Sequence, residues 1–172
     1  MKIFYVHHAL RAKGNPPSQY DDIKELGAQD AKIVAQIFED SKKYLNIKAI
    51  YTSPYFRCKK TAEIINEKLN VPVFDEPRFN EFNDVYAYIK GDAKNSGERW
   101  KGLQESIIDA IKEIVNKYDE DRNDCVICVT SGVNITAFID LAYGLEPSEK
   151  RPFPMVPSCS PIGFEITKEM CK

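Results

Sequence analysis

The sequence predicts a single α/β domain whose mostly parallel sheet carries helices on both faces. Its 172 residues, of which 43% are hydrophobic and 29% charged, are enough for one substantial core. Short runs rich in β-branched and aromatic residues alternate with longer stretches whose apolar residues recur at helical spacing. No internal repeat or linker divides residues 1–172. Strands that alternate with helices are typical of a parallel sheet buried on both sides.

In the first half of the chain, β-rich runs alternate with two amphipathic stretches. A loop dense in Gly, Pro, Asn and Ser follows the first run. Ser53 and Pro54 form a helix-start signal, with the hydroxyl as N-cap and the proline at the first helical position. The predicted elements are strand 2–6, helix 25–44, strand 47–52, a helix from Ser53 to about Leu69, and a short strand within 71–76.

The second half continues the alternation after an irregular segment. A strong apolar stripe predicts a long helix over its first part, and Gly144 is expected to close a later helix. The predicted elements are the irregular segment 77–95, helix 100–115, strand 125–130, helix 133–144 and strand 161–167.

Composition narrows the functional classes. The formal net charge of −2 provides no basic field for nucleic acid or for a membrane surface. No apolar stretch approaches the ~20 residues of a membrane span. The N-terminus lacks the features of a signal peptide and is interpreted as a strand. Five cysteines are an odd number without a disulfide framework, so we expect reduced thiols and a cytoplasmic protein.

Cys125 and Cys128 form a CxxC pattern, which invites a redox or zinc interpretation. They lie in a β-branched run, where residues three apart face opposite sides of a sheet. No second CxxC and no nearby histidine completes a metal site. We therefore expect core cysteines, no metal and no cofactor.

Both histidines of the chain, His7 and His8, stand side by side after the first predicted strand. Neighbouring side chains of a strand leave on opposite faces. One histidine is then expected in a pocket and the other elsewhere, unless the strand has already ended and the loop redirects them.

Polar and reactive side chains follow three of the predicted strands. Ligands of such sheets bind beyond the carboxyl ends of the strands. Imidazole, guanidinium and hydroxyl groups together with helix N-termini suit an anion, most simply a phosphate. The three groups are His7, His8 and Arg11; Thr52, Ser53 and Arg57; and Thr130, Ser131 and Gly132.

Nearly the whole chain resembles the histidine phosphatase superfamily, also called the phosphoglycerate mutase-like family. The most specific segment, TSPYFRCKKTAEII, is similar to that family's S-S-P-x-x-R-A-x-Q-T-A. IKELGAQDA resembles L-T-x-x-G-x-x-Q-A, VTSGVNITAFI resembles V-S-H-G-G-V-I-R-A-L-L, and PSCSPIGFEI resembles the closing N-C-S strand. The resemblance implies a three-layer α/β/α sandwich of the histidine phosphatase fold.

The resemblance also implies catalytic roles. VHHAL aligns with V-R-H-G-E, so His8 falls on the histidine that attacks phosphorus and becomes phosphohistidine. Arg57 falls on the second arginine and Glu81 on the acid that protonates the leaving oxygen. His7 stands in place of the first arginine, and Ser131 in place of the second histidine.

These two departures weaken the expected chemistry. Loss of one preorganised donor typically costs about 10²–10³ in rate, and loss of two about 10⁴–10⁶ without strict additivity. Arg11 could replace the missing arginine, Ser131 can donate one hydrogen bond, and the backbone N–H groups of Gly132 and Val133 still favour an anion. Binding is expected to survive better than chemistry.

Two functions remain open. The first is weak hydrolysis of a small phosphomonoester through His8, and the second is an inactive phosphate-binding pseudophosphatase that acts as a sensor or interaction module. A mutase and an unrelated nucleotide-binding domain are disfavoured, the latter because no glycine-rich fingerprint opens the first helix. Ordinary structural roles also remain for the candidates: a hydrogen-bonded His8, a solvated Glu81, a surface Arg11 and an N-cap at Ser131.

Overall fold

The computed structural model describes residues 1–12, 20–81, 96–118, 120–145 and 156–171. Five strands form one sheet in the order β3-β2-β4-β1-β5. The first four strands run parallel to one another, and β5 runs antiparallel to β1 at the sheet edge. This confirms the mostly parallel sheet. The strands are β1 (Lys2–His7), β2 (Asn46–Thr52), β3 (Val73–Asp75), β4 (Asp124–Thr130) and β5 (Pro161–Glu165).

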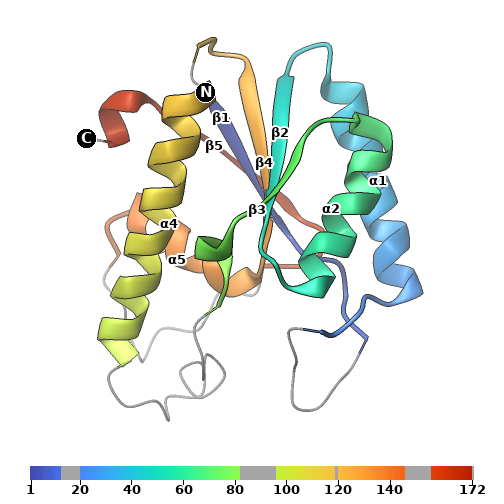
Figure 1. The fold of residues 1–172 in the computed structure, drawn as a ribbon, viewed down its shortest axis with the longest axis horizontal. Helices are drawn as coiled ribbons and strands as arrows, with labels where there is room; N and C mark the ends of the chain where they lie inside the picture. The colour runs from blue at the N-terminus through green and yellow to red at the C-terminus, as the bar shows by residue number, and fades with distance from the viewer. Residues whose placement is uncertain (13–19, 82–95, 119, 146–155, 172) are drawn as a thin grey trace.

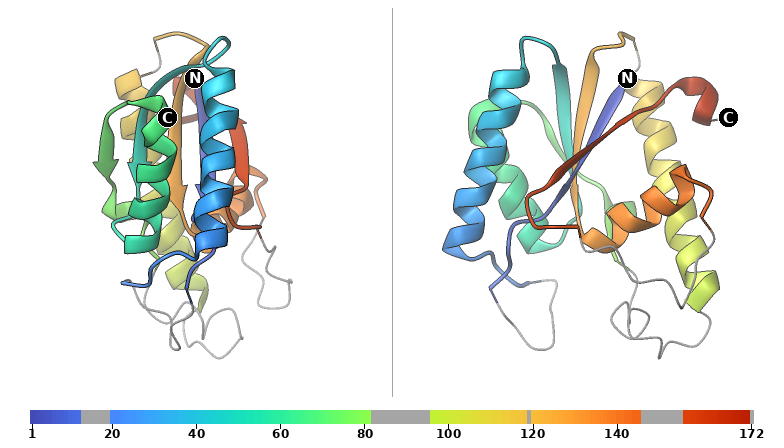
Figure 2. Two further views of the ribbon diagram at one scale, coloured as in Figure 1. Left: turned by 90° about the vertical axis from the view of Figure 1, so that its right-hand side faces the viewer. Right: turned by 180° about the vertical axis from the view of Figure 1, so that it is seen from behind.

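Helices cover both faces of the sheet, as the three-layer prediction required. In Figure 1, α1 and α2 lie on one side of the strands and α4 and α5 on the other; Figure 2 shows the same layers from behind. Two buried apolar clusters correspond to the two interfaces between sheet and helices. The helices are α1 (Glu25–Ser41), α2 (Phe56–Leu69), α4 (Ser96–Tyr118) and α5 (Gly132–Ala142), with short 3₁₀ turns at Pro77–Phe79 and Lys168–Cys171.

The central strand β4 is buried along its whole length, which explains its continuous apolar composition. Cys125 packs in the cluster that includes α1 and α2, and Cys128 packs in the cluster that includes α4 and α5. Burial raises the pKa of the Cys125 thiol to about 12 and also raises that of Cys128. The CxxC pattern is thus a pair of core cysteines on opposite faces of one strand, as predicted.

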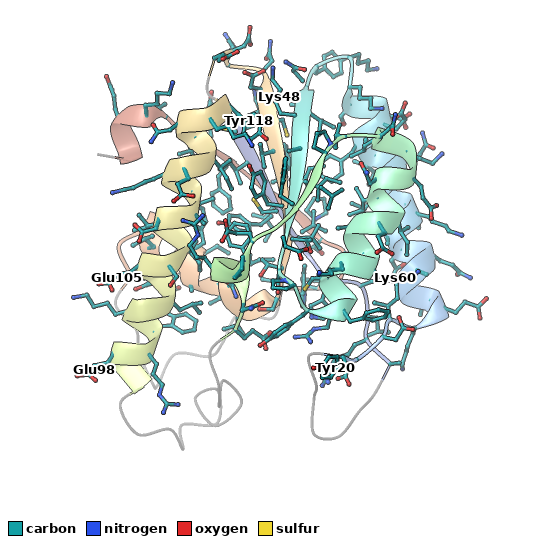
Figure 3. All side chains as sticks on the ribbon, in the orientation of Figure 1. Tyr20, Lys48, Lys60, Glu98, Glu105 and Tyr118 are labelled. Carbon is teal, nitrogen blue, oxygen red and sulfur yellow. The ribbon has the colours of Figure 1, made fainter. Side chains whose placement is uncertain are left out.

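Charged side chains line the outer surfaces of the helices. Figure 3 shows Glu98 and Glu105 on the side of α4 that faces away from the sheet. Lys60 lies on α2 with about half of its side chain exposed. This alternation of a buried apolar face and an exposed charged face is what the helical spacing predicted.

The boundaries of the first two helices differ from the predictions. The predicted N-cap at Ser53 is wrong, because α2 begins only at Phe56 after an extended Tyr55 that makes no side-chain cap. The Ser53 hydroxyl instead donates a hydrogen bond to Asn80 Oδ1 at 2.7 Å. Helix α1 ends at Ser41, three residues before the predicted end. Gly144 lies beyond α5 with φ of 61°, a left-handed conformation that suits its expected place after the helix.

The strand order brings the three polar strand ends together. Strand β4 lies between β2 and β1, and the carboxyl ends of all three meet at the same edge. His7 at the end of β1 is in register with Thr130 at the end of β4, and Thr52 of β2 is in register with Val129. The side chains expected to bind an anion therefore start from adjacent backbone positions.

Candidate active site

His7 and His8 lie next to each other at the carboxyl end of β1. Their ring centroids are 4.5 Å apart and their planes meet at 70°. The two side chains therefore do not point apart, which is the exception that the sequence left open. Strand β1 ends at His7, so the strict alternation of side chains no longer applies to His8.

His8 is buried and uses both ring nitrogens. Nδ1 donates a hydrogen bond to the carbonyl of Ala9 at 2.8 Å, and Nε2 accepts one from Nε of Arg57 at 2.9 Å. A nitrogen that accepts a hydrogen bond carries a lone pair, so His8 is the neutral tautomer with its proton on Nδ1. Burial, and then the charges of His7 and Arg57, hold the pKa of His8 well below its usual value.

Thr61 links two parts of the site by hydrogen bonds: the loop that contains His8 and the helix that contains Arg57. Its hydroxyl accepts a hydrogen bond from the Ala9 N–H at 2.9 Å and donates one to the Arg57 carbonyl at 2.7 Å. Thr61 is fully buried. The sequence identified Thr61 only as part of a family motif; the signal for its role was a hydroxyl one helical turn after the arginine.

Arg57 is brought together with Glu81, as the resemblance implied. Nη2 of Arg57 lies 3.4 Å from Oε1 of Glu81, and the two side chains are only 3% and 9% exposed. The guanidinium also lies 4.7 Å from the centre of the Tyr55 ring, within the range of a cation–π interaction. Glu81 is therefore not a solvated loop acid.

Ser131 and Gly132 form the start of α5. The Ser131 hydroxyl accepts a weak hydrogen bond from the Asn134 N–H at 3.4 Å, which makes Ser131 the N-cap. Gly132 lies against His7: a Cβ atom at Gly132 would be 3.3 Å from His7 Cε1. The first turn of α5 thus meets the imidazole that precedes His8.

Arg11 is close to the site but paired elsewhere. Its Nη1 lies 2.8 Å from Oδ2 of Asp21, in an ion pair that the sequence analysis did not anticipate. The positive charge of Arg11 still contributes to the lowered pKa of His8. Its movement into the place of the missing arginine stays a prediction.

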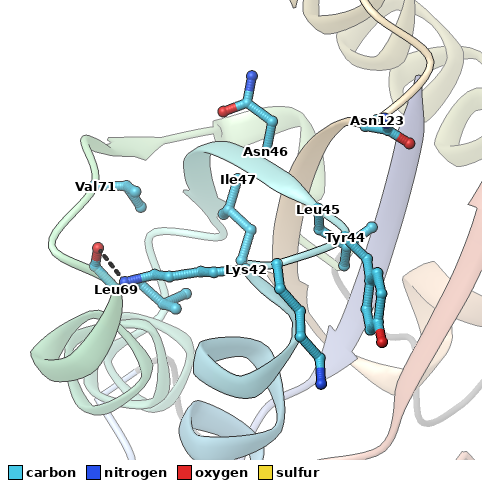
Figure 4. Close-up of a pocket in the computed structure, with 9 residues that line it drawn as sticks. Lys42, Tyr44, Leu45, Asn46, Ile47, Leu69, Val71 and Asn123 are labelled. Carbon is cyan, nitrogen blue, oxygen red and sulfur yellow. Dashed lines mark hydrogen bonds between the residues drawn. The ribbon is translucent and has the colours of Figure 1, made fainter.

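A pocket among the described residues lies away from the histidines. It has a volume of about 480 Å³ and is lined by residues at or just after the ends of α1 and α2 together with the start of β2, including Lys42, Tyr44 and Leu69 (Figure 4). There Nζ of Lys42 donates hydrogen bonds to carbonyls at the end of α2.

Among the described residues, no group of three His, Cys, Asp or Glu side chains could hold a metal ion. None of the helices in the described ranges is long and apolar enough to cross a membrane.

Comparison with known proteins bears on the fold. The sequence model of the histidine phosphatase superfamily (branch 1) matches residues 18–86. No curated protein matches the chain in sequence. YhfR of Bacillus stearothermophilus is similar in structure with a TM-score of 0.75 at 20% identity, over 96% of this chain and 91% of that chain.

Two phosphatases also share the fold. A mycobacterial glucosyl-3-phosphoglycerate phosphatase in complex with VO3 has a TM-score of 0.71 at 17% identity, over 94% of this chain and 90% of that chain. The protein histidine phosphatase SixA, complexed with tungstate, has a TM-score of 0.68 at 14% identity, over 98% of this chain and 90% of that chain. The resemblance seen in the sequence is thereby confirmed: the protein has the histidine phosphatase fold, and the superfamily's sequence model matches it over residues 18–86.

Proposed function

We propose that this protein hydrolyses a small phosphomonoester through a phosphohistidine formed at His8. One observation carries the proposal: Nε2 of a neutral, buried His8 accepts a hydrogen bond from Arg57. The Nε2 lone pair is the nucleophile that an attack on a phosphoryl group requires. The guanidinium beside it stabilises the charge around phosphorus once its donors turn from Nε2 to the phosphoryl oxygens.

In the first step, Nε2 of His8 forms a bond to phosphorus while the bond from phosphorus to the leaving oxygen breaks. Arg57 moves its donors from Glu81 to the phosphoryl oxygens. The freed Glu81 carboxylate takes up a proton from solvent and passes it to the leaving oxygen. The proton stays on Nδ1, and the hydrogen bond from Nδ1 to the Ala9 carbonyl holds the ring in one orientation. In the second step water attacks phosphorus, its proton passes to Glu81, and the electron pair of the N–P bond returns to Nε2.

Proteins with the same fold support an anionic ligand. The two phosphatases with this fold were solved with VO3 and with tungstate, both oxyanions. A small phosphorylated molecule is therefore the substrate class that we infer. The pairing of Arg57 with Glu81 and of Arg11 with Asp21 leads us to expect a slow reaction, because each guanidinium must give up a carboxylate to bind the phosphoryl group.

A second function, phosphate binding without turnover, is favoured by one observation. The Ser131 hydroxyl caps α5 and supplies no charge at the position of the second histidine. A domain that keeps Arg57 and the α5 N-terminus would bind phosphate and fail to transfer it. This alternative pseudophosphatase would act as a sensor or an interaction module.

Turnover of a panel of phosphomonoesters by wild type, His8→Gln and Glu105→Gln distinguishes the two functions. Glu105 lies on the outer face of α4, so this variant controls for the effect of a Glu→Gln or His→Gln type of substitution itself, and the His8→Gln preparation controls for contaminating phosphatases. We expect activity in wild type and Glu105→Gln and none in His8→Gln. When the phosphoryl group of the substrate is labelled and the reaction is stopped with alkali, the two active proteins should retain the label and His8→Gln should not. Equal activity in all three proteins would overturn the phosphohistidine mechanism. Phosphate binding without turnover would favour the pseudophosphatase.

A further inference from the structure

The described part of the site carries no net positive charge. Arg57 is paired with Glu81 at 3.4 Å, and Arg11 is paired with Asp21 at 2.8 Å. The pKa of His8 is lowered well below its usual value, so this imidazole is neutral at pH 7. A phosphoryl dianion that enters such a site meets helix dipoles and hydrogen-bond donors but no unpaired charge among these side chains. Its binding is expected to draw a proton into the site.

His8 is not the residue that takes up this proton. Its Nδ1 already donates to Ala9, and its Nε2 accepts from Arg57. Protonation of Nε2 would place two donors face to face, and it would remove the lone pair that the proposed reaction uses.

His7 is arranged differently. Its Nδ1 lies 2.6 Å from the Val156 carbonyl, so this nitrogen carries a proton and Nε2 is the position of the second one. The ring lies beside the first residue of α5, where backbone N–H groups of a helix start favour an anion. It is also 4.5 Å from the ring of His8. An imidazolium at this place would contact the same phosphoryl group.

We propose that His7 binds the phosphoryl group as an imidazolium, so that ligand binding is coupled to the uptake of one proton at His7. This inference rests on the proposed function, because it concerns the same site. The proton takes the place of a fixed positive charge, and affinity becomes sensitive to pH in the neutral range.

The groups around His7 support such a switch. Burial lowers its pKa most, and Arg57 acts in the same direction. The carbonyls of Val156 and Pro157 and the carboxylate of Glu81 act in the opposite direction. Free His7 is therefore neutral at pH 7, and a bound dianion next to its ring raises its pKa. Affinity is then constant below the pKa of the free protein and falls by about tenfold per pH unit between the free and bound pKa values.

Sulfate is the probe that tests the coupling, because its charge does not change between pH 5 and 9 and all titration belongs to the protein. The chain has only two histidines, so nitrogen-15 NMR resolves both rings and reports the protonation of each nitrogen. We expect sulfate to raise the pKa of His7 and to leave Nε2 of His8 unprotonated. Sulfate affinity should fall at least tenfold between pH 6 and pH 8.

Two variants act as matched controls. His7→Arg carries a fixed charge at the same position, so it should bind sulfate with little dependence on pH. His7→Gln carries a donor without a charge, so it should bind more weakly at pH 6 and also with little dependence on pH. Sulfate binding with no change at His7, or with proton uptake at His8, overturns this inference and leaves the proposed function standing. No binding of sulfate or phosphate to wild type overturns both.

Discussion

Nε of Arg57 donates a hydrogen bond of 2.9 Å to Nε2 of His8, although 49 residues separate the two in sequence. Both groups are buried, and one hydroxyl, that of Thr61, is hydrogen-bonded to the backbone of Ala9 and of Arg57. The pair defines the protonation state of His8 and places a cation beside its lone pair. Four predictions follow from this arrangement and from its neighbours.

Replacement of Arg57 should affect stability and titration together. Arg57→Gln leaves the Glu81 carboxylate buried without its cation, and removal of one partner from a buried pair costs about 3–5 kcal/mol. The pKa of His8 should rise, although only in part, because burial is the largest cause of its low value. Urea unfolding and histidine NMR titration measure the two effects. An unchanged unfolding free energy with an unchanged His8 pKa would contradict the ion pair.

Thr61→Val should weaken the link between His8 and Arg57 while it preserves side-chain shape. The Ala9 N–H then stays buried without an acceptor, which costs about 1–3 kcal/mol. If the proposed hydrolysis holds, kcat should fall more than KM rises, because the nucleophile and the cation lose their fixed separation. Thr61→Ser retains the hydroxyl and should restore most of kcat; a Ser variant as impaired as the Val variant would argue for a packing role alone.

Gly132→Ala should disturb His7 and leave the fold intact. The new Cβ would lie 3.3 Å from His7 Cε1, so the ring must move by a few tenths of an ångström. We expect shifted His7 NMR signals and at least a threefold loss of sulfate affinity. Gly102→Ala is the control, since nothing lies within 4 Å of its added methyl group in α4. The unfolding free energy of that variant should rise by about 0.5–1 kcal/mol, and both His7 signals should stay unchanged.

Stability should fall in mild acid because both imidazoles have lowered pKa values in the fold. Below about pH 6.5 the unfolded chain binds protons that the folded site excludes. The contribution of the two imidazoles to the unfolding free energy is thus fully present above this pH, and it decreases as the pH falls toward their pKa values in the folded protein. Each histidine contributes up to about 1.4 kcal/mol per pH unit. Urea unfolding between pH 7.5 and 5 checks this. The double variant His7→Gln/His8→Gln should show a markedly flatter dependence of the unfolding free energy on pH.

The sequence alone determined the architecture. The continuous apolar run of β4 required cover on both faces, and the apolar spacing of α4 and α5 supplied cover on one of them. The motif around Arg57 was specific enough to identify the fold, because a match of residue types at fixed spacing does not depend on long-range contacts. The start of α2 could not be predicted correctly from the sequence, because the Ser53 hydroxyl donates a hydrogen bond to Asn80 across the fold and does not cap the helix.

Only the tertiary structure decided how the site is charged. The partners of Arg57 and Arg11 are carboxylates at other positions along the chain, and their approach depends on how loops pack at the sheet edge. The side-by-side rings of His7 and His8 likewise depend on where β1 ends and on the α5 turn that meets them. Local spacing specifies which groups are present. The protonation and pairing of those groups depend on burial and on neighbours distant in sequence, which no local pattern contains.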